Sequence, residues 1–217
     1  MVSTNGVLGL IFADGAVEDV RQSSRTCYVH LSSKDKSLLK QVLAVLSSNH
    51  SLYRREPRVF SIKGRICYGS EIFYLRIGNK VMFQDLLEKG VKPRKSLTMK
   101  LPNIPEGHFS FFLRGYFDGD GCVNVYVPKR RSQPNIQVIF TSGSLEFLKS
   151  LMEKLNYFLG ISRKKIFKNC RAFRLSYKNN DSLKILAFIY KDLSKAPYLK
   201  SKYAVYKDLI EHLDVSR

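Results

Sequence analysis

The sequence predicts an α+β protein built from two similar halves, and three kinds of pattern support this prediction. A seven-residue motif occurs twice, short stretches alternate apolar and polar side chains as strands do, and longer stretches repeat apolar residues with helical spacing. Within each half, the predicted order is helix, two strands, helix, two strands, helix. The whole chain therefore reads as two copies of one mixed unit.

The duplication is clearest at the motif. Residues 9–15 (GLIFADG) reappear as residues 115–121 (GYFDGDG), an offset of 106 residues. Downstream, residues 28–33 (YVHLSS) match residues 137–142 (QVIFTS). Both landmarks occur in the same order, which favours duplication over chance.

Two further landmarks extend the repeat toward the end of each copy. Apolar-periodic stretches follow at residues 35–46 and 144–159, and both predict helices. A basic segment that begins with proline then recurs, and it pairs Lys95 with Lys202. The repeat therefore covers most of the chain.

The boundary between the copies falls in a stretch without helical or strand period. Residues 97–107 contain Pro102 and Pro105, which is typical of a connecting segment. We therefore expect an N-terminal half at residues 1–96, a linker at residues 97–107 and a C-terminal half at residues 108–217.

Local patterns predict individual elements. The first helix should cover residues 5–14, with Thr4 or Asn5 as its N-cap. Two strands should have one apolar and one polar face, since their apolar residues alternate with polar ones. The apolar positions of these strands are Cys27, Val29 and Leu31 in the first half and Phe173, Leu175 and Tyr177 in the second.

Composition points to a polyanionic partner. The chain has 37 Lys and Arg against 18 Asp and Glu, a formal charge of +19 spread along its length. Such a charge favours nucleic acid or another polyanion, although a merely soluble basic protein is the alternative. No apolar run is long enough for a membrane span and no signal peptide is evident, so we expect a soluble, intracellular protein without a membrane partner.

The four cysteines do not indicate a metal site. Cys27, Cys67, Cys122 and Cys170 are far apart and form no CxxC pair, and the four histidines are equally scattered. We expect no zinc, and we expect the cysteines to be buried free thiols.

Small residues four positions apart give each motif helix a flat stripe. The pairs are Gly9 with Ala13 and Gly115 with Gly119. Flat stripes allow helix backbones to approach closely, so the two motif helices are predicted to pair across a pseudo-twofold axis. The alternative is that each helix is an ordinary amphipathic helix buried in its own half.

Asp14 and Asp120 are the candidate catalytic carboxylates. Each ends a motif helix, where the macrodipole disfavours a negative charge, so a cation should compensate each of them. If the helices pair, the carboxylates meet, and two like charges about 4 Å apart repel by about 4 kcal/mol at an effective dielectric near 20. Bridging divalent cations would relieve that repulsion. The alternative is that Asp-Gly only marks a helix stop and a turn.

The paired motifs resemble the signature of the LAGLIDADG homing endonucleases of the two-motif, single-chain type. The resemblance rests on GLIFADG and on residues 113–121 (LRGYFDGDG), and it extends over nearly the whole chain. It implies two αββαββα halves that pack through the motif helices, with antiparallel sheets that form a DNA-binding saddle. One departure is Phe12, where the second copy has Asp118.

The resemblance also implies roles for individual residues. The last acid of each motif, Asp14 and Asp120, would bind Mg²⁺ beside the scissile phosphates. A lysine near the end of each half would lie by the active site, and Lys95 and Lys202 match best, although Arg94 and Lys200 are near neighbours. The implied activity is hydrolysis of both strands of a long, asymmetric duplex DNA by a monomer, leaving short 3′ overhangs.

Polar strand residues are the candidates for contact with DNA, because a two-stranded ribbon fits the major groove and their donors suit base edges. Many of them would meet only phosphate. The candidates are Arg54, Arg55, Arg58, Arg65, Arg76, Asn124, Tyr126, Arg130, Gln137, Lys168, Arg171 and Arg174.

Two other classes of function remain open at this point. One is a non-cleaving descendant of the same family, either an intron RNA maturase or a sequence-specific DNA-binding regulator. The other is an unrelated basic protein that binds nucleic acid without sequence preference. An intein is not favoured, since no nucleophile begins the chain and no His-Asn ends it, so we expect a free-standing and intron-encoded protein.

Overall fold

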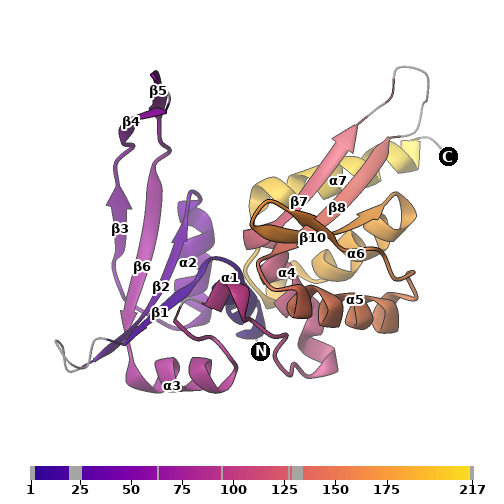
Figure 1. Ribbon diagram of the computed structural model, residues 1–217. Helices are drawn as coiled ribbons and strands as arrows, with labels where there is room; N and C mark the ends of the chain where they lie inside the picture. The colour runs from indigo at the N-terminus through magenta and orange to yellow at the C-terminus, as the bar shows by residue number, and fades with distance from the viewer. Residues whose placement is uncertain are drawn as a thin grey trace.

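The chain folds into two halves on either side of a central pair of helices (Figure 1). The computed structural model describes residues 3–19, 26–62, 64–93, 95–126, 128 and 134–215. The first half contains α1 (Asn5–Asp14), β1 (Ala16–Asp19), β2 (Cys27–Ser33), α2 (Lys36–Val45), β3 (Leu52–Arg55), β4 (Val59–Ile62), β5 (Arg65–Tyr68), β6 (Ile72–Gly78) and α3 (Lys80–Glu88). The second contains α4 (Phe109–Asp120), β7 (Gly121–Tyr126), β8 (Asn135–Ser142), α5 (Leu145–Leu159), β9 (Phe167–Asn169), β10 (Ala172–Lys178), α6 (Asn180–Tyr190) and α7 (Lys200–Val215), and short 3₁₀ turns are η1 (Lys95–Leu97), η2 (Glu106–His108) and η3 (Leu193–Lys195).

The predicted fold class is confirmed. Each half has one antiparallel four-stranded sheet, in the orders β1-β2-β6-β3 and β7-β8-β10-β9, which are the same order in the two copies. Helices cover one face of each sheet and leave the other face open. The alternation predicted for Cys27 to Leu31 is confirmed, since Cys27, Val29 and Leu31 are buried and the residues between them are not.

The structure adds two strands to the predicted first half and one helix to the predicted second half. In the first half, β4 and β5 form a separate two-stranded ribbon that projects beyond β3 and β6 (Figure 1). In the second half, α7 follows α6 after the turn η3. The copies therefore share a core but differ at their outer parts.

Side chains cap the N-termini of α2, α3 and α5, whereas α1, α4 and α6 have no side-chain capping bond. Asp35 caps α2 by accepting from the backbone N–H groups of Ser37 and Leu38, at 2.7 and 3.2 Å. Ser144 caps α5 by accepting from Phe147 N at 3.2 Å. Thr4, one of the two predicted caps, occupies the N-cap position of α1, but it has helical backbone angles and its side chain makes no capping bond.

Helices α1 and α4 pack at very short range, and this confirms the predicted pairing of the motif helices. A Cβ on Gly9 would lie 2.0 Å from the carbonyl oxygen of Phe112, and a Cβ on Gly115 would lie 2.0 Å from that of Gly6. Since real Cβ atoms do not approach an oxygen so closely, only glycine fits at either position. The alternative of two separate amphipathic helices is excluded, because α1 is buried from Gly6 to Phe12 on all sides.

The core is continuous across the helix pair. Phe12 of α1 packs edge-on against Phe112 of α4, with ring centroids 5.5 Å apart, and against Phe147 of α5 at 6.5 Å. Tyr116 of α4 contacts the same Phe147 ring at 4.5 Å. Aromatic side chains from both halves therefore fill one shared interior.

The expectation for the cysteines is only partly right. All four are free thiols, but only Cys27 is buried, while Cys122 and Cys170 are exposed. No helix in the described part of the chain combines the length and the apolar character that crossing a membrane requires.

Candidate metal and nucleic-acid site

The motif aspartates lie together at the adjoining ends of α1 and α4. A Cβ built on Gly119 would lie 2.4 Å from Cβ of Ala13 and 2.9 Å from Oδ2 of Asp14, so the two helix ends are in direct contact. Asp120 is the next residue after Gly119 and ends α4 as Asp14 ends α1. The pairing of the helices thus brings two distant carboxylates to one place.

The helices do not end here in the usual glycine turn. Gly15 and Gly121 follow the aspartates in extended conformations, with φ of −81° and −86°. A Cβ on Gly15 would lie 2.6 Å from Cα of Ile11 in the preceding helical turn, so glycine allows the chain to fold back closely. The helix-stop explanation therefore accounts for the glycines, but it does not account for the aspartates.

Both carboxylates are electrostatically frustrated. Neither makes a hydrogen bond or a close ion pair with any residue that the structure describes. Desolvation raises the pKa of Asp14, and desolvation together with the charge of Asp14 raises the pKa of Asp120 to about 6. Their side chains are nevertheless open to the surface, so an ion can reach them from solvent.

This pair of oxygen donors fits a hard divalent cation. Within the described ranges, no cluster of three or more His, Cys, Asp or Glu side chains could hold a metal. Mg²⁺ is commonly held by one or two carboxylates together with waters and substrate phosphates, so two carboxylates are sufficient. An ion shared by Asp14 and Asp120 would also remove the repulsion that raises the pKa of Asp120.

Lys95 and Lys202 occupy equivalent positions behind the carboxylates. The ammonium group of Lys95 donates to the carbonyl oxygen of Gly15, and that of Lys202 donates to the carbonyl oxygen of Gly121 at 2.6 Å. Lys202 also donates to the carbonyl oxygens of Phe117 and Asp118, at 2.7 and 2.9 Å. The lysines are therefore the cations expected at these helix C-termini.

Burial and charge have opposite effects on the lysines. Desolvation lowers the pKa of both, while the nearby aspartates raise it. Lys95 is buried at 7% relative exposure, and Lys202 is half-buried. The neighbouring Lys200 is exposed, and Arg94 lies outside the described residues, so Lys95 and Lys202 are the pair that the helix ends hold.

Asp118, which departs from the first motif, lies under the second helix end. It is 4% exposed and accepts from Tyr190 Oη at 3.0 Å and from the backbone N–H of Leu199 at 2.8 Å. Burial raises the pKa of Asp118 to about 7. Because Leu199 directly precedes α7, this carboxyl anchors the helix that carries Lys202.

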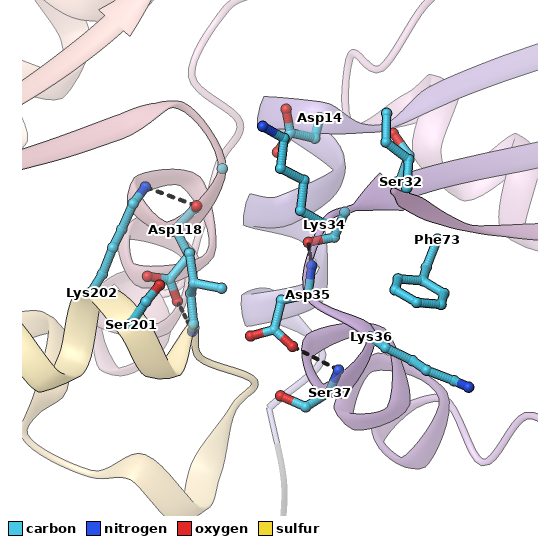
Figure 2. Close-up of a pocket in the computed structure, with 14 residues that line it drawn as sticks. Asp14, Ser32, Lys34, Asp35, Lys36, Ser37, Phe73, Asp118, Ser201 and Lys202 are labelled. Carbon is cyan, nitrogen blue, oxygen red and sulfur yellow. Dashed lines mark hydrogen bonds between the residues drawn. The ribbon is translucent and has the colours of Figure 1, made fainter. Parts of the chain in front are cut away.

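A cleft between the halves opens beside this site. It has a volume of about 830 Å³, and Figure 2 shows Asp14 on one wall with Lys202 and Asp118 on the other. Lys34, which precedes the cap of α2, and Lys36, the first residue of α2, also line it. The acidic site is therefore bordered by basic side chains from both halves.

The open face of the first sheet carries mostly polar and aromatic side chains. Register places Arg55 and Arg76 on this face, because Arg55 pairs with Ile72 and Arg76 pairs with His30. Tyr53 and Tyr74 stack there with ring centroids 5.2 Å apart. We call this set the first open face, and it comprises Glu18, Tyr28, His30, Ser32, Tyr53, Arg55, Ile72, Tyr74 and Arg76.

The second sheet presents a corresponding face. A hollow of about 670 Å³ over it is lined by Asn124, Gln137 and Arg174 together with Lys164, Lys165 and Lys178. Gln137 donates to Ser176 Oγ at 2.7 Å. We call this set the second open face, and it comprises Cys122, Asn124, Tyr126, Asn135, Gln137, Ile139, Thr141, Arg174, Ser176 and Lys178.

Several predicted DNA contacts do not lie on these faces. Register starts Arg54 on the side of the buried Phe73, and Glu56 and Glu71 hold its guanidinium. Its side chain still borders a hollow of about 440 Å³ that Ser32, Ile72 and Tyr74 of the first open face also line. Lys168 pairs with Phe173 on the corresponding side of the second sheet.

Two other predicted contacts, Arg65 and Arg171, are exposed outside the open faces, and one lies beyond the described residues. Arg58 borders the same hollow as Arg54, beside the first open face. Arg58 precedes the β4–β5 ribbon, Arg65 begins its second strand, and Arg171 lies in the turn before β10. Arg130 lies outside the described residues.

Sequence reasoning missed part of the first open face. Glu18 Oε2 and His30 Nε2 lie at hydrogen-bond distance, 3.0 Å apart, and Arg76 stacks on the ring of Tyr28 at 3.6 Å. The alternation of residues 26–31 already places Tyr28 and His30 on the polar side of their strand, so the sequence could have predicted these two residues on the open face. Glu18 was passed over because an acidic residue does not suggest contact with DNA.

Comparison with known proteins agrees with this geometry. A family model described as LAGLIDADG endonuclease matches residues 113–213, which include most of the second motif and α7. Fold and site define a single-chain protein of two similar halves that meet through paired helices. The resemblance indicated by the motifs is thus confirmed, and the second half matches the LAGLIDADG endonuclease family.

Solved structures extend the likeness to the whole chain. I-SmaMI, a LAGLIDADG homing endonuclease bound to cleaved DNA, has a TM-score of 0.62 and 18% identity, covering 100% of this chain and 90% of that one. The LAGLIDADG meganuclease I-AabMI bound to uncleaved DNA has a TM-score of 0.57 and 17% identity, covering 99% and 90%. I-SmaMI bound to its uncleaved target in the presence of calcium ions has a TM-score of 0.60. At these identities, the likeness establishes the fold.

A curated relative matches a shorter part. The reverse gyrase of Methanocaldococcus jannaschii is 24% identical over 149 residues, which is 68% of this chain. The chain spans about 8% of the length of that relative, so the match carries no activity of the whole protein.

Proposed function

We propose that this protein is a site-specific DNA endonuclease that acts as a monomer on duplex DNA. One observation carries the proposal: Asp14 and Asp120 lie together at the ends of the paired helices, between the two open sheet faces. Neither carboxylate has a hydrogen-bond or close ion-pair partner among the described residues. The fold is that of I-SmaMI and I-AabMI, which have been solved bound to DNA, and the second half matches the endonuclease family.

Asp14 and Asp120 would hold the divalent cation, and we propose Mg²⁺. A bound divalent cation supplies neutralisation of phosphate charge and lowers the pKa of a water that can attack phosphorus. The two aspartates fix where that happens, because the helix packing leaves them little freedom to separate. Calcium in the I-SmaMI complex is consistent with oxygen ligands for a hard cation.

Lys95 and Lys202 would each hold a positive charge close to the metal-binding carboxylates. Each ammonium group is fixed on the carbonyl oxygen of the glycine that follows a motif aspartate. From there each places a positive charge beside one carboxylate, where it favours an approaching phosphate. No histidine lines the site in the described part of the chain, so the proton of the attacking water would pass to solvent.

The open faces would bind the duplex on either side of the cutting site. The faces differ in almost every side chain, so they would read different sequences, and the target would lack the twofold symmetry that a homodimer requires. The +19 charge would supply sequence-independent attraction to phosphates.

A plasmid library that carries randomised inserts tests the proposal. With Mg²⁺, we expect the protein to convert a subset of supercoiled plasmids to linear DNA. Asp14→Asn and Asp120→Asn should each reduce cleavage at least a hundredfold while binding persists, because each removes a charged metal ligand. Asp85→Asn, an exposed change on α3 outside the site, is the matched control and should cleave as the parent does.

Two outcomes would contradict the endonuclease. If every plasmid stays intact with metal while the protein binds a structured intron RNA tightly, a maturase is the better description. If unrelated duplex DNA competes as well as any selected sequence, the protein is a non-specific binder.

A further inference from the structure

Four side chains at the centre of the first open face form a fixed cluster. Glu18 Oε2 lies 3.0 Å from His30 Nε2 and 3.4 Å from Arg76 Nη2. The guanidinium of Arg76 lies over the ring of Tyr28, with 3.6 Å between Cζ and the ring centroid. Strand register explains the cluster, because Glu18 pairs with Tyr28 and Arg76 pairs with His30 across three adjacent strands.

Arg76 is held in place, and most of its N–H donors remain free to bind a ligand. It makes one side-chain hydrogen bond within the described part of the chain, to Glu18, and its side chain remains 41% exposed. A guanidinium has five N–H donors, so most of its donors point to no protein acceptor. The ring of Tyr28 fixes the plane of the group and Glu18 fixes its rotation, which reduces the freedom that Arg76 would lose on binding.

We propose that Arg76 is the residue that selects a guanine in the half of the target bound by the first open face, and that Glu18 positions it. This inference rests on the proposed function and deepens it. A planar guanidinium fork matches the N7 and O6 acceptors that guanine presents in the major groove. Glu18 also repels phosphate, so an arginine that it holds back from the DNA backbone remains available for a base edge.

The cluster also locates the guanine in the target. Glu18 lies four residues beyond Asp14, which is at most about 13 Å along an extended strand. Base pairs stack at about 3.4 Å, so this length corresponds to about four base pairs. The selected guanine should therefore lie within about four base pairs of the cutting site, on one side only.

The other half of the molecule has different chemistry at the same place. By register, Asn124 corresponds to Glu18, Gln137 to Tyr28 and Ser176 to Arg76. The corresponding cluster is neutral, with Gln137 bonded to Ser176. A guanine preference from Arg76 would therefore have no symmetric counterpart across the cutting site.

Binding selection from a randomised duplex library tests the proposal. Parent protein should enrich guanine at one position near the cutting site, and Arg76→Lys should reduce that preference about 5- to 150-fold, the range for one bidentate base contact, without changing other positions. Arg163→Lys is the matched control, since Arg163 is an exposed arginine that pairs with Glu153 in the other half, and it should leave that position unchanged. Thermal unfolding of both variants checks that they are folded.

Glu18→Gln separates positioning from simple repulsion. We expect weaker guanine preference at the same position together with higher affinity for random DNA, whereas mere repulsion would raise affinity and leave the preference intact. Tyr28→Phe keeps the ring and should behave as the parent, and Tyr28→Leu should resemble Arg76→Lys.

The outcomes distinguish this inference from the proposed function. A parent protein that selects a sequence in which Arg76→Lys changes no position overturns the inference alone. Selection and guanine reading without cleavage overturn the endonuclease alone. A parent that selects no sequence overturns both.

Discussion

At the ends of α1 and α4, two carboxylates lie in surroundings that disfavour their charge. The pKa of Asp120 is raised to about 6 from an ordinary value of 3.8, by burial first and by Asp14 second. A carboxyl whose pKa is higher in the folded state holds its proton more tightly there, so its contribution to stability falls as the pH rises from about 4 to about 6. Without metal, the charged carboxyl of Asp120 therefore lowers the free energy of unfolding at neutral pH.

Replacing Asp120 tests this weakness. In metal-free buffer, Asp120→Asn should be more stable than the parent by about 1 kcal/mol at pH 7, a value reduced for solvent screening, and the difference should vanish near pH 4. Urea unfolding at both pH values measures it. Mg²⁺ should narrow the gap at pH 7 by stabilising only the parent, and an Asn variant no more stable at pH 7 would contradict the argument.

Individual residues also show where sequence reasoning reaches its limit. The repeat allowed four site residues to be predicted, because each residue can be compared with its counterpart in the other copy. These residues are Asp14, Asp120, Lys95 and Lys202. Arg54 could not be placed, since its side is fixed by pairing with Phe73, a contact that depends on how the chain turns between β3 and β6. The sequence identified the polar residues on the strands, but it did not show on which face of the sheet each of them lies.

At the level of elements, contact between the motif helices depends on two glycines. Gly9 faces the backbone of α4 and Gly115 faces the backbone of α1, each where a Cβ would lie 2.0 Å from a carbonyl oxygen. Backbone cannot move aside as a flexible side chain can. A methyl group at either position must therefore push the helices apart.

Alanine substitution measures this close approach. Gly9→Ala and Gly115→Ala should each lower the free energy of unfolding by about 3 kcal/mol, because overpacking strains a well-filled interface. Gly107→Ala is the matched control: nothing lies within 4 Å of its Cβ, so its effect should stay within about 0.5 kcal/mol. Chemical denaturation of the three variants decides, and equal stability of all three would refute the close packing.

Element boundaries were predictable where apolar periodicity was strong. The helix predicted at residues 144–159 matches α5, whose buried residues recur with helical spacing. The helix predicted at residues 5–14 also matches α1, but α1 is buried on all sides, so its apolar residues show no such period. The sequence did not predict β4 and β5 as separate strands. Both faces of this ribbon are exposed, so its apolar and polar residues do not alternate between a buried side and an exposed side. Helix α7 was seen only as a basic segment, because its first residues are charged.

For the whole molecule, the two halves complete one interior. Helix α1 is buried almost throughout and α4 is buried from Phe109 to Asp118, with Phe12 of one half packed against Phe112 and Phe147 of the other. Each half alone would expose the apolar side of its motif helix. The division at residues 97–107 remains a prediction, and the linker is itself anchored, since Ser144 donates to the carbonyl oxygen of Met99 at 2.6 Å.

Separating the halves tests this dependence. We expect residues 108–217 alone to aggregate or to pair with themselves through α4, because the exposed helix face would seek a partner. Co-expression with residues 1–96 should restore a soluble one-to-one complex. A monomeric second half with cooperative unfolding, measured by sedimentation and circular dichroism, would show that the halves fold independently.

The difference beneath the two helix ends bears on the order of events at the DNA. Asp118 ties Lys202 to the second end through α7, whereas the first end has Phe12 in that place and Lys95 on a short turn. Two centres supported so differently have no reason to work at one speed. We expect one strand to be severed first, so that a singly nicked duplex accumulates briefly before the break is complete.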